Sequence, residues 1–276
     1  MNNPRQQILI VGADSYIGTR FAAYGAERFD ITTIDARNRN WDEVNMTAFD
    51  TVLYVAGIAH VKQTRQLKPL YYQINRDLSV TVAKKAKTDG VQQFIFMSSM
   101  AACTSKKNDY YGDSKRQAEA LLSDLQDEHF QVAIVRPPMV YGPGCKGNFP
   151  RLVASVRRAP IFPEIKNARS VIFIDNLCVF LCNLAQIGSG GLYHPQNRDY
   201  NCTTQMVRLI AACQGKKICT TQLFNWLIYA LMPLFSGLEK LFGSHCLPFN
   251  GDEDDYSVID YEESIRVSVC TSLSSE

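Results

Sequence analysis

Three residues near the middle of the chain have the types and the spacing needed for a shared proton transfer. Tyr111 and Lys115 are four residues apart in a segment predicted to be helical, so their side chains lie on one face of that helix. An ammonium group beside a phenol favours the phenolate and lowers the pKa of the tyrosine. Ser99 follows an apolar segment predicted to be a buried strand, and its hydroxyl can hydrogen-bond the substrate oxygen that the tyrosine deprotonates. We therefore predict that Ser99, Tyr111 and Lys115 are catalytic.

A tyrosine and a lysine at this spacing are also common on solvated helix faces, so the surrounding elements must decide between the two interpretations. Helical segments separate most of a series of short apolar segments, which cover residues 7–11, 29–35, 51–57, 94–98 and 132–135. This alternation, in units of about 20 to 30 residues, is typical of a doubly wound parallel sheet. The sequence thus predicts an α/β protein of the Rossmann type, with ligands at the carboxyl ends of the strands. A further strand within residues 36–50 is doubtful, because that segment is short and polar.

The first predicted strand runs directly into the sequence Gly12-Ala-Asp-Ser15-Tyr-Ile-Gly18. Gly12 permits a tight turn, Gly18 permits close packing of the next helix on the strand, and the helix N-terminus presents free N–H groups to a pyrophosphate. Ser15 stands where the usual pattern has a glycine, and there it either narrows the approach of the phosphates or adds a hydroxyl donor. The turn predicts a dinucleotide site formed by Gly12, Ser15, Tyr16, Ile17 and Gly18.

The dinucleotide is predicted to be NAD. Asp35 ends the second predicted strand, 17 residues after Gly18. A carboxylate at this position can accept both hydroxyls of an adenosine ribose, and it repels a 2′-phosphate. Arg37 is close by in the sequence and is the residue that weakens this preference against NADP.

Two further segments are predicted to lie under the cofactor. Ala56 and Gly57 end the third apolar segment with small side chains, which leaves clearance for the nicotinamide. Asn75 lies in a long helix predicted for residues 66–89, and as a buried amide with partners it would brace the strand ends. The same helix is predicted to face the core with a stripe at intervals of four, namely Leu70, Ile74, Leu78 and Val82.

Several motifs occur in one order along the first 180 residues. They are the glycine turn of residues 12–18, Asp35, Ala56-Gly57, Asn75, Ser98-Ser99, Tyr111-x-x-x-Lys115, Arg136-Pro-Pro-Met-Val-Tyr-Gly-Pro-Gly144, Asn148-Phe149 and Arg169-Ser-Val-Ile-Phe-Ile-Asp175. Each motif is weak alone, but together they resemble the extended short-chain dehydrogenases/reductases. Within that group the chain is similar to the NAD-dependent epimerase/dehydratase family that acts on nucleotide sugars, such as the UDP-glucose/UDP-galactose 4-epimerases.

The resemblance implies roles for residues around the cofactor. Tyr111 would be the general base or acid on a sugar hydroxyl, and Ser99 occupies the position of the family's catalytic serine or threonine. Lys115 would bind the nicotinamide ribose while lowering the pKa of the tyrosine. Pro138 would lie by the nicotinamide, and the cofactor would be NAD.

It also implies roles for residues around the substrate. Ser99 and Met139 would contact the sugar, although Met139 stands where sugar epimerases often carry an asparagine. Asn148 and Arg169 would hold the nucleotide diphosphate, a role that suits a guanidinium because it binds phosphate as a planar fork. The implied partner is a nucleotide sugar, specifically a UDP-sugar.

The implied activity is that of an NAD-dependent nucleotide-sugar epimerase of polysaccharide biosynthesis, a 4-epimerase that acts on a UDP-sugar through a transient keto-sugar. The C–H bond of a secondary alcohol is not acidic, so inversion requires oxidation followed by reduction from the opposite face. Two alternatives stay open: an NAD(P)H-dependent 4-keto nucleotide-sugar reductase, and a non-catalytic dinucleotide-binding regulator. A dehydratase is less favoured, because Met100-Ala101 stands where such enzymes carry an Asp-Glu pair.

The chain is predicted to have two parts. Residues 1–175 would form the NAD-binding domain with the catalytic residues. Residues 176–276 would form mainly a smaller substrate-binding part, interleaved with the segment 137–170. Helices predicted around residues 70–88 and 111–128 are where similar proteins form a four-helix contact, so a homodimer is expected.

Composition excludes several other classes of protein. The chain has 46% hydrophobic and 20% charged residues and a net charge of +2, which is typical of an ordinary globular protein and gives no reason to expect a nucleic-acid partner. The 9 cysteines are scattered, and the nearest pair, Cys178 and Cys182, lies in an apolar helical segment. We therefore predict buried thiols, no metal site and a cytoplasmic location.

Residues 223–242 form the most apolar stretch of the chain. A membrane span needs about 20 mostly apolar residues, and this stretch is interrupted by Pro233, Ser236, Gly237, Glu239 and Lys240. We expect no integral membrane span but two short helices, packed on the substrate-binding part or on a partner subunit. Peripheral contact with a membrane is the alternative.

Overall fold

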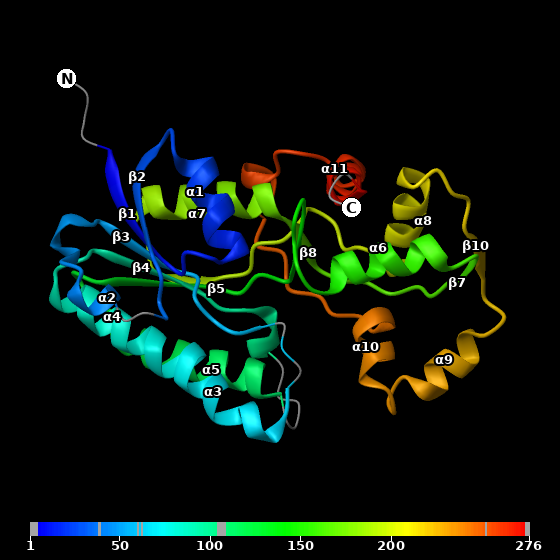
Figure 1. The fold of residues 1–276 in the computed structure, drawn as a ribbon, viewed down its shortest axis with the longest axis horizontal. Coiled ribbons are helices and arrows are strands. Elements are labelled where there is room, and N and C mark those ends of the chain that lie inside the picture. The colour runs from blue at the N-terminus through cyan, green and yellow to red at the C-terminus, as the bar shows by residue number, and fades with distance from the viewer. Residues whose placement is uncertain are drawn as a thin grey trace. The chain divides into compact units, whose positions relative to one another are not determined.

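The computed structural model describes residues 5–37, 40–59, 61, 63–103, 109–251 and 253–273. The chain divides into two compact units (Figure 1). The first comprises Met1–Pro138 and Leu177–Pro195, and the second comprises Met139–Asn176 and Gln196–Glu276.

A parallel sheet of six strands forms the centre of the first unit, in the order β2-β1-β3-β4-β5-β9. The strands are β1 (Gln6–Val11), β2 (Phe29–Ile34), β3 (Thr51–Tyr54), β4 (Gln93–Met97), β5 (Gln131–Val135) and β9 (Gly191–Tyr193). The strand order reverses between β1 and β3, which is where ligands bind in open α/β sheets. The predicted Rossmann-type α/β fold is confirmed.

Helices cover both faces of this sheet (Figure 1). One face carries α1 (Tyr16–Gly25) and α7 (Ile174–Ile187), and the other carries α4 (Ser79–Thr88) and α5 (Tyr110–Ser123). The strands between these layers are apolar because both of their faces are buried. Every residue of β3 and β4 is buried, and the Tyr54 ring lies 6.0 Å from that of Phe94. Each large side chain buried in this way stabilises the fold by about 1.5 to 3 kcal/mol.

The doubt about a strand within residues 36–50 was justified. Among the described residues of this segment, the chain forms α2 (Asn40–Glu43) and a 3-10 turn at Met46–Ala48. Trp41 and Met46 are buried in the core, so this short connection covers part of the sheet without extending it.

The helix after β3 changes pitch, and its predicted core stripe is confirmed only in its second half. It consists of α3 (Lys68–Tyr72), a π-helical turn (Gln73–Leu78) and α4. Val82 is buried and Leu78 packs against the core, as predicted. Leu70 is 38% exposed, however, and the buried positions of the first half are Tyr71, Asn75 and Ser79. The buried face is displaced because Asn75 and Ser79 find hydrogen-bond partners inside the protein, as Ser79 Oγ does on the Arg76 carbonyl at 2.8 Å.

The second unit combines three longer helices with two parallel strand pairs. The helices are α6 (Asn148–Arg158), α8 (Thr203–Cys213) and α11 (Tyr261–Leu273). The pairs are β6 (Met139–Tyr141) with β8 (Val171–Phe173), and β7 (Ile161–Pro163) with β10 (Cys219–Thr221). Tyr141 lies in the core of this unit, where its hydroxyl is 2.6 Å from Ser264 Oγ.

Residues 223–242 form two short helices, α9 (Asn225–Leu231) and α10 (Ser236–Phe242), as predicted. Neither helix is long enough to cross a bilayer, since each has 7 residues. The same holds throughout the described part of the chain, where no helix combines the length and the apolar character of a membrane span.

Candidate active site

Two polar side chains fix the start of α5, the helix that carries Tyr111 and Lys115. Asp109 is its N-cap, and its carboxylate accepts a hydrogen bond from the Gly112 N–H at 3.1 Å. Gln63 donates to that carboxylate at 3.0 Å and accepts from the Tyr111 N–H at 3.1 Å. Sequence reasoning missed both residues, although an aspartate shortly before a predicted helix start is a recognisable capping signal.

Gly112 allows α5 to approach the segment that follows β4. A Cβ atom at this position would lie 2.5 Å from the carbonyl oxygen of Ala101. Ala101 belongs to the 3-10 turn Met100–Cys103, which directly follows Ser99. The missing side chain therefore lets the helix that carries Tyr111 pack against the segment that carries Ser99.

Ser99 and Tyr111 meet in the structure. Burial raises the pKa of Tyr111 above its usual value, and a side-chain hydrogen bond with Ser99 acts in the opposite direction. The Ser99 oxygen also accepts from the Ala101 N–H at 3.2 Å, which orients the hydroxyl. The prediction that Lys115 lowers the pKa of Tyr111 is wrong here, because desolvation of the phenol dominates.

Lys115 of α5 is buried, and its side chain reaches the carboxyl end of β4. Its side chain is 4% exposed, and its Nζ donates a hydrogen bond to the Met97 carbonyl at 2.6 Å. The same nitrogen lies 4.4 Å from the centre of the Phe96 ring. Burial lowers the pKa of Lys115 to about 7, against the attraction of Glu119. A lysine with this pKa can gain and lose its proton near neutral pH.

Asn75 braces the loop after β3 against α5. Its amide accepts from the Ile58 N–H at 2.9 Å and donates to the Ile58 carbonyl at 3.1 Å and to Ser114 Oγ at 3.2 Å. A Cβ atom on Gly57 would lie 2.9 Å from the Asn75 oxygen and 3.6 Å from Lys115 Nζ. Gly57, Asn75 and Lys115 are therefore brought together, and Ala56 precedes them with its N–H on the Val11 carbonyl at 3.0 Å.

A buried ion pair beside these residues was not found from the sequence. Glu119 is 4% exposed and accepts from Arg136 Nε at 2.9 Å and from Nη2 at 2.5 Å. It also accepts from Ser98 Oγ. One carboxylate thus joins α5 to Ser98, which precedes Ser99 after β4, and to Arg136, two residues before Pro138 after β5.

The glycine turn has the donors that a pyrophosphate needs. Gly12 has a φ of 127°, and a Cβ atom there would lie 2.8 Å from the Ala56 nitrogen, so only glycine fits. Ser15 is the N-cap of α1 and accepts from the Gly18 N–H at 2.8 Å. Tyr16 and Ile17 form the first turn of α1, and the positive end of the helix dipole at this turn suits an anion. The Ser15 hydroxyl can still donate its own proton.

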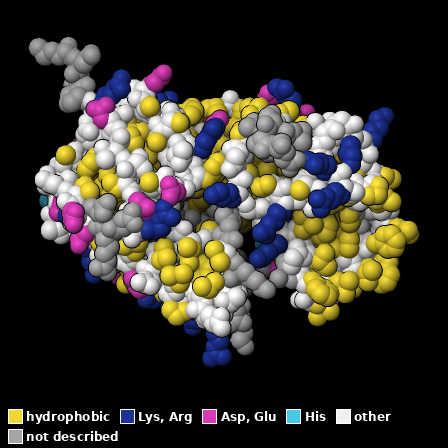
Figure 2. Space-filling view, viewed as in Figure 1, with side chains coloured by type: hydrophobic (Ala, Val, Ile, Leu, Met, Phe, Trp, Pro, Cys, Tyr) yellow, Lys and Arg dark blue, Asp and Glu magenta, His cyan; other side chains and the backbone are white. Residues whose placement is uncertain are grey.

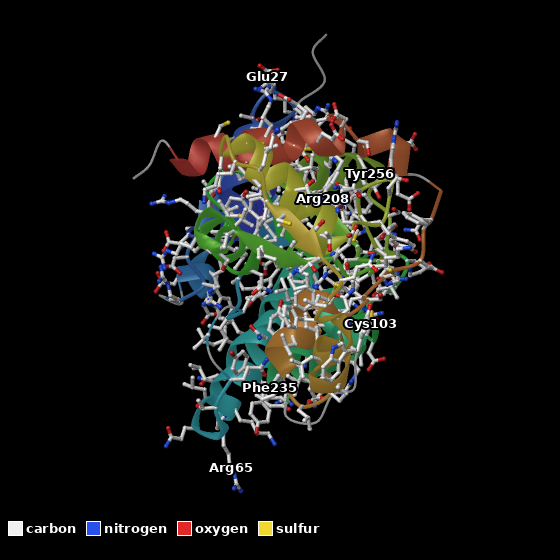
Figure 3. The ribbon with its side chains drawn as sticks, turned by 90° about the vertical axis from the view of Figure 1, so that its right-hand side faces the viewer. Glu27, Arg65, Cys103, Arg208, Phe235 and Tyr256 are labelled. Atoms are coloured by element: carbon white, nitrogen blue, oxygen red, sulfur yellow. The ribbon has the colours of Figure 1, made fainter. Side chains whose placement is uncertain are left out.

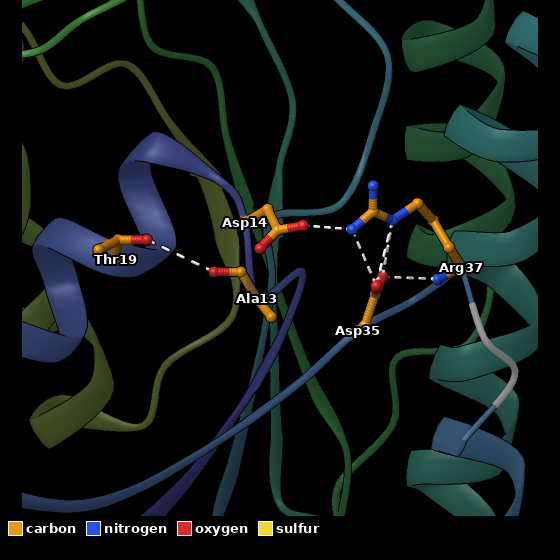
Figure 4. Close-up of polar contacts among 5 residues, drawn as sticks. All are labelled: Ala13, Asp14, Thr19, Asp35 and Arg37. Atoms are coloured by element: carbon orange, nitrogen blue, oxygen red, sulfur yellow. Dashed lines mark hydrogen bonds and ion pairs between the residues drawn. The ribbon is translucent and has the colours of Figure 1, made fainter.

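Asp35 is not a lone carboxylate. Arg37 Nε donates to both of its oxygens at 3.1 Å, and Arg37 Nη2 also pairs with Asp14 from the glycine turn (Figure 4). Hydrogen bonds from Arg37 hold the pKa of Asp35 below its usual value. The carboxylate is therefore ionised and placed beside the turn, but it shares its position with a guanidinium.

Three predicted substrate residues belong to the second unit. Met139 begins β6, and Asn148 begins α6. Arg169 is half-buried, and its guanidinium donates to the carbonyl oxygen of Lys240 in α10. Burial lowers the pKa of Arg169. A carbonyl partner holds the guanidinium without neutralising it, which suits a site for phosphate, but the roles of these three residues stay predictions.

The cysteines are not arranged as ligands or disulfides. All of them are free thiols, but the prediction of buried thiols holds only for Cys178 and Cys182 on α7. The others are partly or fully exposed, namely Cys103, Cys145, Cys202, Cys213, Cys219, Cys246 and Cys270. Burial raises the pKa of Cys182 to about 11, as expected of an inert thiol. Within the described ranges, no three His, Cys, Asp or Glu side chains are placed to hold a metal ion.

Named relatives of the chain are epimerases and a reductase. UDP-glucose 4-epimerase of Vibrio cholerae is 30% identical, over 62% of this chain and 64% of that protein. N-acetyl-alpha-D-glucosaminyl-diphospho-ditrans,octacis-undecaprenol 4-epimerase of Escherichia coli O157:H7 is 23% identical, over 76% of this chain and 73% of that protein. UDP-2-acetamido-2,6-beta-L-arabino-hexul-4-ose reductase of Pseudomonas aeruginosa is 27% identical, over 62% of this chain and 47% of that protein. The chain thus spans less than two thirds of the Vibrio and Pseudomonas proteins.

A solved structure shares the fold over the whole chain. UDP-N-acetylglucosamine 4-epimerase of Methanobrevibacter ruminantium M1 has a TM-score of 0.77 and 14% identity, over 99% of this chain and 100% of that one. Residues 8–203 also match the model of the NAD dependent epimerase/dehydratase family. Because that match covers more than half of its length, this chain belongs to the NAD dependent epimerase/dehydratase family, which confirms the resemblance found in the sequence and the predicted cofactor, NAD.

Proposed function

We propose that this protein is an NAD-dependent nucleotide-sugar epimerase, a 4-epimerase that acts on a UDP-sugar through a transient keto-sugar. The observation that carries the proposal is that the Tyr111 phenol lies beside the Ser99 side chain, on the helix that also brings Lys115 Nζ to the Met97 carbonyl at the end of β4. Two relatives, at 30% and 23% identity, are 4-epimerases by name, which supports this reaction.

The proton transfer follows from the chemistry of these residues. Tyr111 Oη removes the proton from the sugar hydroxyl while the carbon is oxidised, and returns it when the carbonyl is reduced. Ser99 donates a hydrogen bond to the same oxygen atoms and stabilises the negative charge. Since burial raises the pKa of Tyr111, the phenol is mostly protonated near neutral pH, and turnover rises with pH. When bound, NAD supplies the hydride acceptor and donor for this chemistry.

Residues of the first unit would hold the cofactor. The N–H groups of Tyr16 and Ile17 fit the pyrophosphate, and Asp35 fits the adenosine ribose. Lys115 would bind the nicotinamide ribose from its position on the Met97 carbonyl. The backbone around this site would be shaped by Gly12, Ser15, Gly18, Ala56, Gly57, Asn75 and Pro138.

Residues of the second unit would bind the substrate. Asn148 and Arg169 would hold the diphosphate, and Met139 would contact the sugar. The names of two relatives share one chemical feature, a sugar joined to its carrier through phosphate: UDP-glucose in one, and an undecaprenol-linked diphosphate sugar in the other. We therefore propose a sugar diphosphate as the substrate class, since the diphosphate is the part that both names share.

A keto-sugar reductase is the second candidate. The same proton path would reduce a 4-keto nucleotide sugar, and a relative at 27% identity is a reductase by name. A non-catalytic regulator that binds the dinucleotide is the third candidate, although Ser99, Tyr111 and Lys115 are all present.

One experiment separates these candidates. The purified protein is mixed with a series of UDP-sugars, without added cofactor and then with NADH, while product and absorbance at the NADH band are followed. An epimerase converts a UDP-sugar without net NADH consumption. A reductase consumes one NADH for each 4-keto sugar, and a regulator binds NAD without turnover; either result would reject the proposal.

We also propose that two copies associate through the helices on one face of the sheet. Leu70 of α3 and Leu121 of α5 are 38% and 44% exposed, although both are large and apolar. Light scattering should then give the mass of two chains, and a monomer would reject the dimer. The cytoplasmic location and the role in polysaccharide biosynthesis stay predictions.

A further inference from the structure

The most exposed apolar surface of the chain is the segment of residues 223–242, which holds α9 and α10. In α9 no residue is buried, although six of its seven residues are apolar. Leu223 and Trp226 are each 69% exposed, and Leu234 is 75% exposed. Figure 2 shows apolar side chains gathered over these two helices. Large exposed apolar patches mark sites of contact with other molecules.

The α9–α10 segment is fixed in this position by its inner contacts. The Asn225 side chain donates to the Glu164 carbonyl at 2.8 Å. At the other end, the Phe242 ring packs 5.6 Å from that of Phe162, and the Leu241 carbonyl accepts from Thr203 Oγ at 2.8 Å. Phe235 lies at the connection between the two helices, at the end that is farther from Arg208 of α8, and its side chain is exposed (Figure 3). The exposed residues are therefore presented by an anchored element.

A basic cluster lies at the end of α6 and just before β10, the strand that precedes the apolar segment. It consists of Arg157, Arg158, Lys216 and Lys217, which are all exposed. The Lys216 ammonium donates to the Arg157 carbonyl, and β10 leads directly from Lys217 toward Leu223. Between residues 214 and 250, Glu239 is the only acidic residue of the sequence. Figure 2 shows Lys and Arg side chains along one side of the apolar patch.

The combination favours a lipid surface over a protein partner. Trp226 and Tyr229 have apolar rings with one polar atom each, and such side chains are enriched where apolar chains meet water in membranes. Lysine is depleted at protein interfaces, whereas lysine beside an exposed apolar helix is typical of helices that lie on anionic bilayers. Each helix is too short to span a bilayer, so both would lie in its plane.

We propose that the α9–α10 segment docks this protein on an anionic membrane surface. Leu223, Phe224, Trp226, Leu227, Leu234 and Phe235 enter the boundary between head groups and acyl chains. The basic cluster faces the anionic head groups beside them. Because Arg169 is held by the Lys240 carbonyl of α10, the surface that docks is joined directly to the arginine proposed for the diphosphate.

The chain contains its own reporter for this contact. It has two tryptophans, and Trp41 is 5% exposed whereas Trp226 is 69% exposed. The probe is a vesicle of phosphatidylglycerol and phosphatidylcholine in equal parts, with vesicles of phosphatidylcholine alone for comparison. We expect the wild type to float with the mixed vesicles, to show a blue shift of tryptophan emission and to be quenched by brominated acyl chains. In Trp226→Phe, binding should persist while the shift and the quenching disappear.

Variants test the two parts of the surface separately. Trp226→Glu with Phe235→Glu should weaken binding about tenfold or more. Val258→Glu is the control for a glutamate outside the segment, because Val258 is 53% exposed and lies in the same unit; it is compared with each single variant, Trp226→Glu and Phe235→Glu, which gain the same charge. Lys216→Gln with Lys217→Gln should weaken binding to the mixed vesicles, and more so at low salt.

Three results would overturn the proposal. One is a folded wild type that floats with neither kind of vesicle. The second is binding that the Trp226 and Phe235 substitutions leave unchanged. The third is self-association that these substitutions abolish while vesicles bind nothing, which would show that a second copy of the chain covers the surface. The proposal is independent of the epimerase activity, since flotation and fluorescence require no turnover.

Discussion

At the scale of single residues, Lys115 shows the cost of placing a charged group in the core. Its burial lowers its pKa from 10.5 to about 7, so a proton on this side chain is disfavoured by the folded protein. A buried lysine lowers the stability of the fold. Active sites often contain such destabilising groups, because their altered pKa serves the reaction. The hydrogen bond of Lys115 to the Met97 carbonyl determines where its charge would act.

We predict that Lys115→Met stabilises the fold and abolishes turnover. Between pH 7 and 10.5 the unfolded chain binds the lysine proton more tightly than the folded one, so wild-type stability rises with pH in this window. At about pH 6.5 the variant should be more stable by a few kcal/mol, and at about pH 9.5 the difference should shrink. Urea unfolding at both values measures this. An equal difference at the two pH values would contradict the assignment of the pKa.

Arg37 is predicted to decide how well the protein accepts NADP. It pairs with Asp35 and Asp14, and without it both carboxylates would face a 2′-phosphate unpaired. Arg37→Ala should weaken NADP binding about tenfold or more while NAD binding changes little. Asp35→Ala should have the opposite effect: it should weaken the binding of NAD and reduce the preference for NAD over NADP. Calorimetric titration with NAD and with NADP measures both affinities. Equal losses of affinity for the two dinucleotides in Arg37→Ala would reject this role of Arg37.

At the scale of elements, the strands could be predicted and the inner face of a helix could not. Strands buried on both faces are continuous apolar segments, so β1, β3, β4 and β5 are visible in the sequence. The predicted core positions Leu70 and Ile74 were wrong because Asn75 points inward there, and the partners that make this possible are Ile58 and Ser114. A side chain whose partners come from other elements cannot be oriented from its own segment alone.

Gly112 sets the distance between two elements, and its replacement is predicted to misplace Tyr111. In Gly112→Ala the new methyl group would meet the Ala101 carbonyl at 2.5 Å, so the start of α5 must move. We expect kcat to fall about tenfold or more and stability to fall by about 1 to 3 kcal/mol. Gly237→Ala is the matched control, because a Cβ atom there meets nothing within 4 Å. Equal kcat values for the two variants would contradict this role of Gly112.

At the scale of the whole molecule, the chain forms two units, and the predicted residues divide between them. Ser99, Tyr111, Lys115 and the glycine turn lie in the first, and Met139, Asn148 and Arg169 lie in the second. The order of motifs in the sequence was enough to identify the family. It was not enough to reveal the ion pair of Glu119 and Arg136, because residues 17 positions apart meet only once β5 lies beside β4.

We propose that Tyr111, aided by Ser99, moves the proton of the sugar hydroxyl. The direct test is the kcat of Tyr111→Phe on the UDP-sugar that the wild type epimerises, measured together with bound NAD and thermal stability. Tyr110→Phe, the neighbouring tyrosine, is the matched control. We predict that kcat falls about 10²-fold or more for Tyr111→Phe alone, with NAD binding and stability preserved. Near-normal turnover in that variant, or a wild type that epimerises no UDP-sugar, would contradict it.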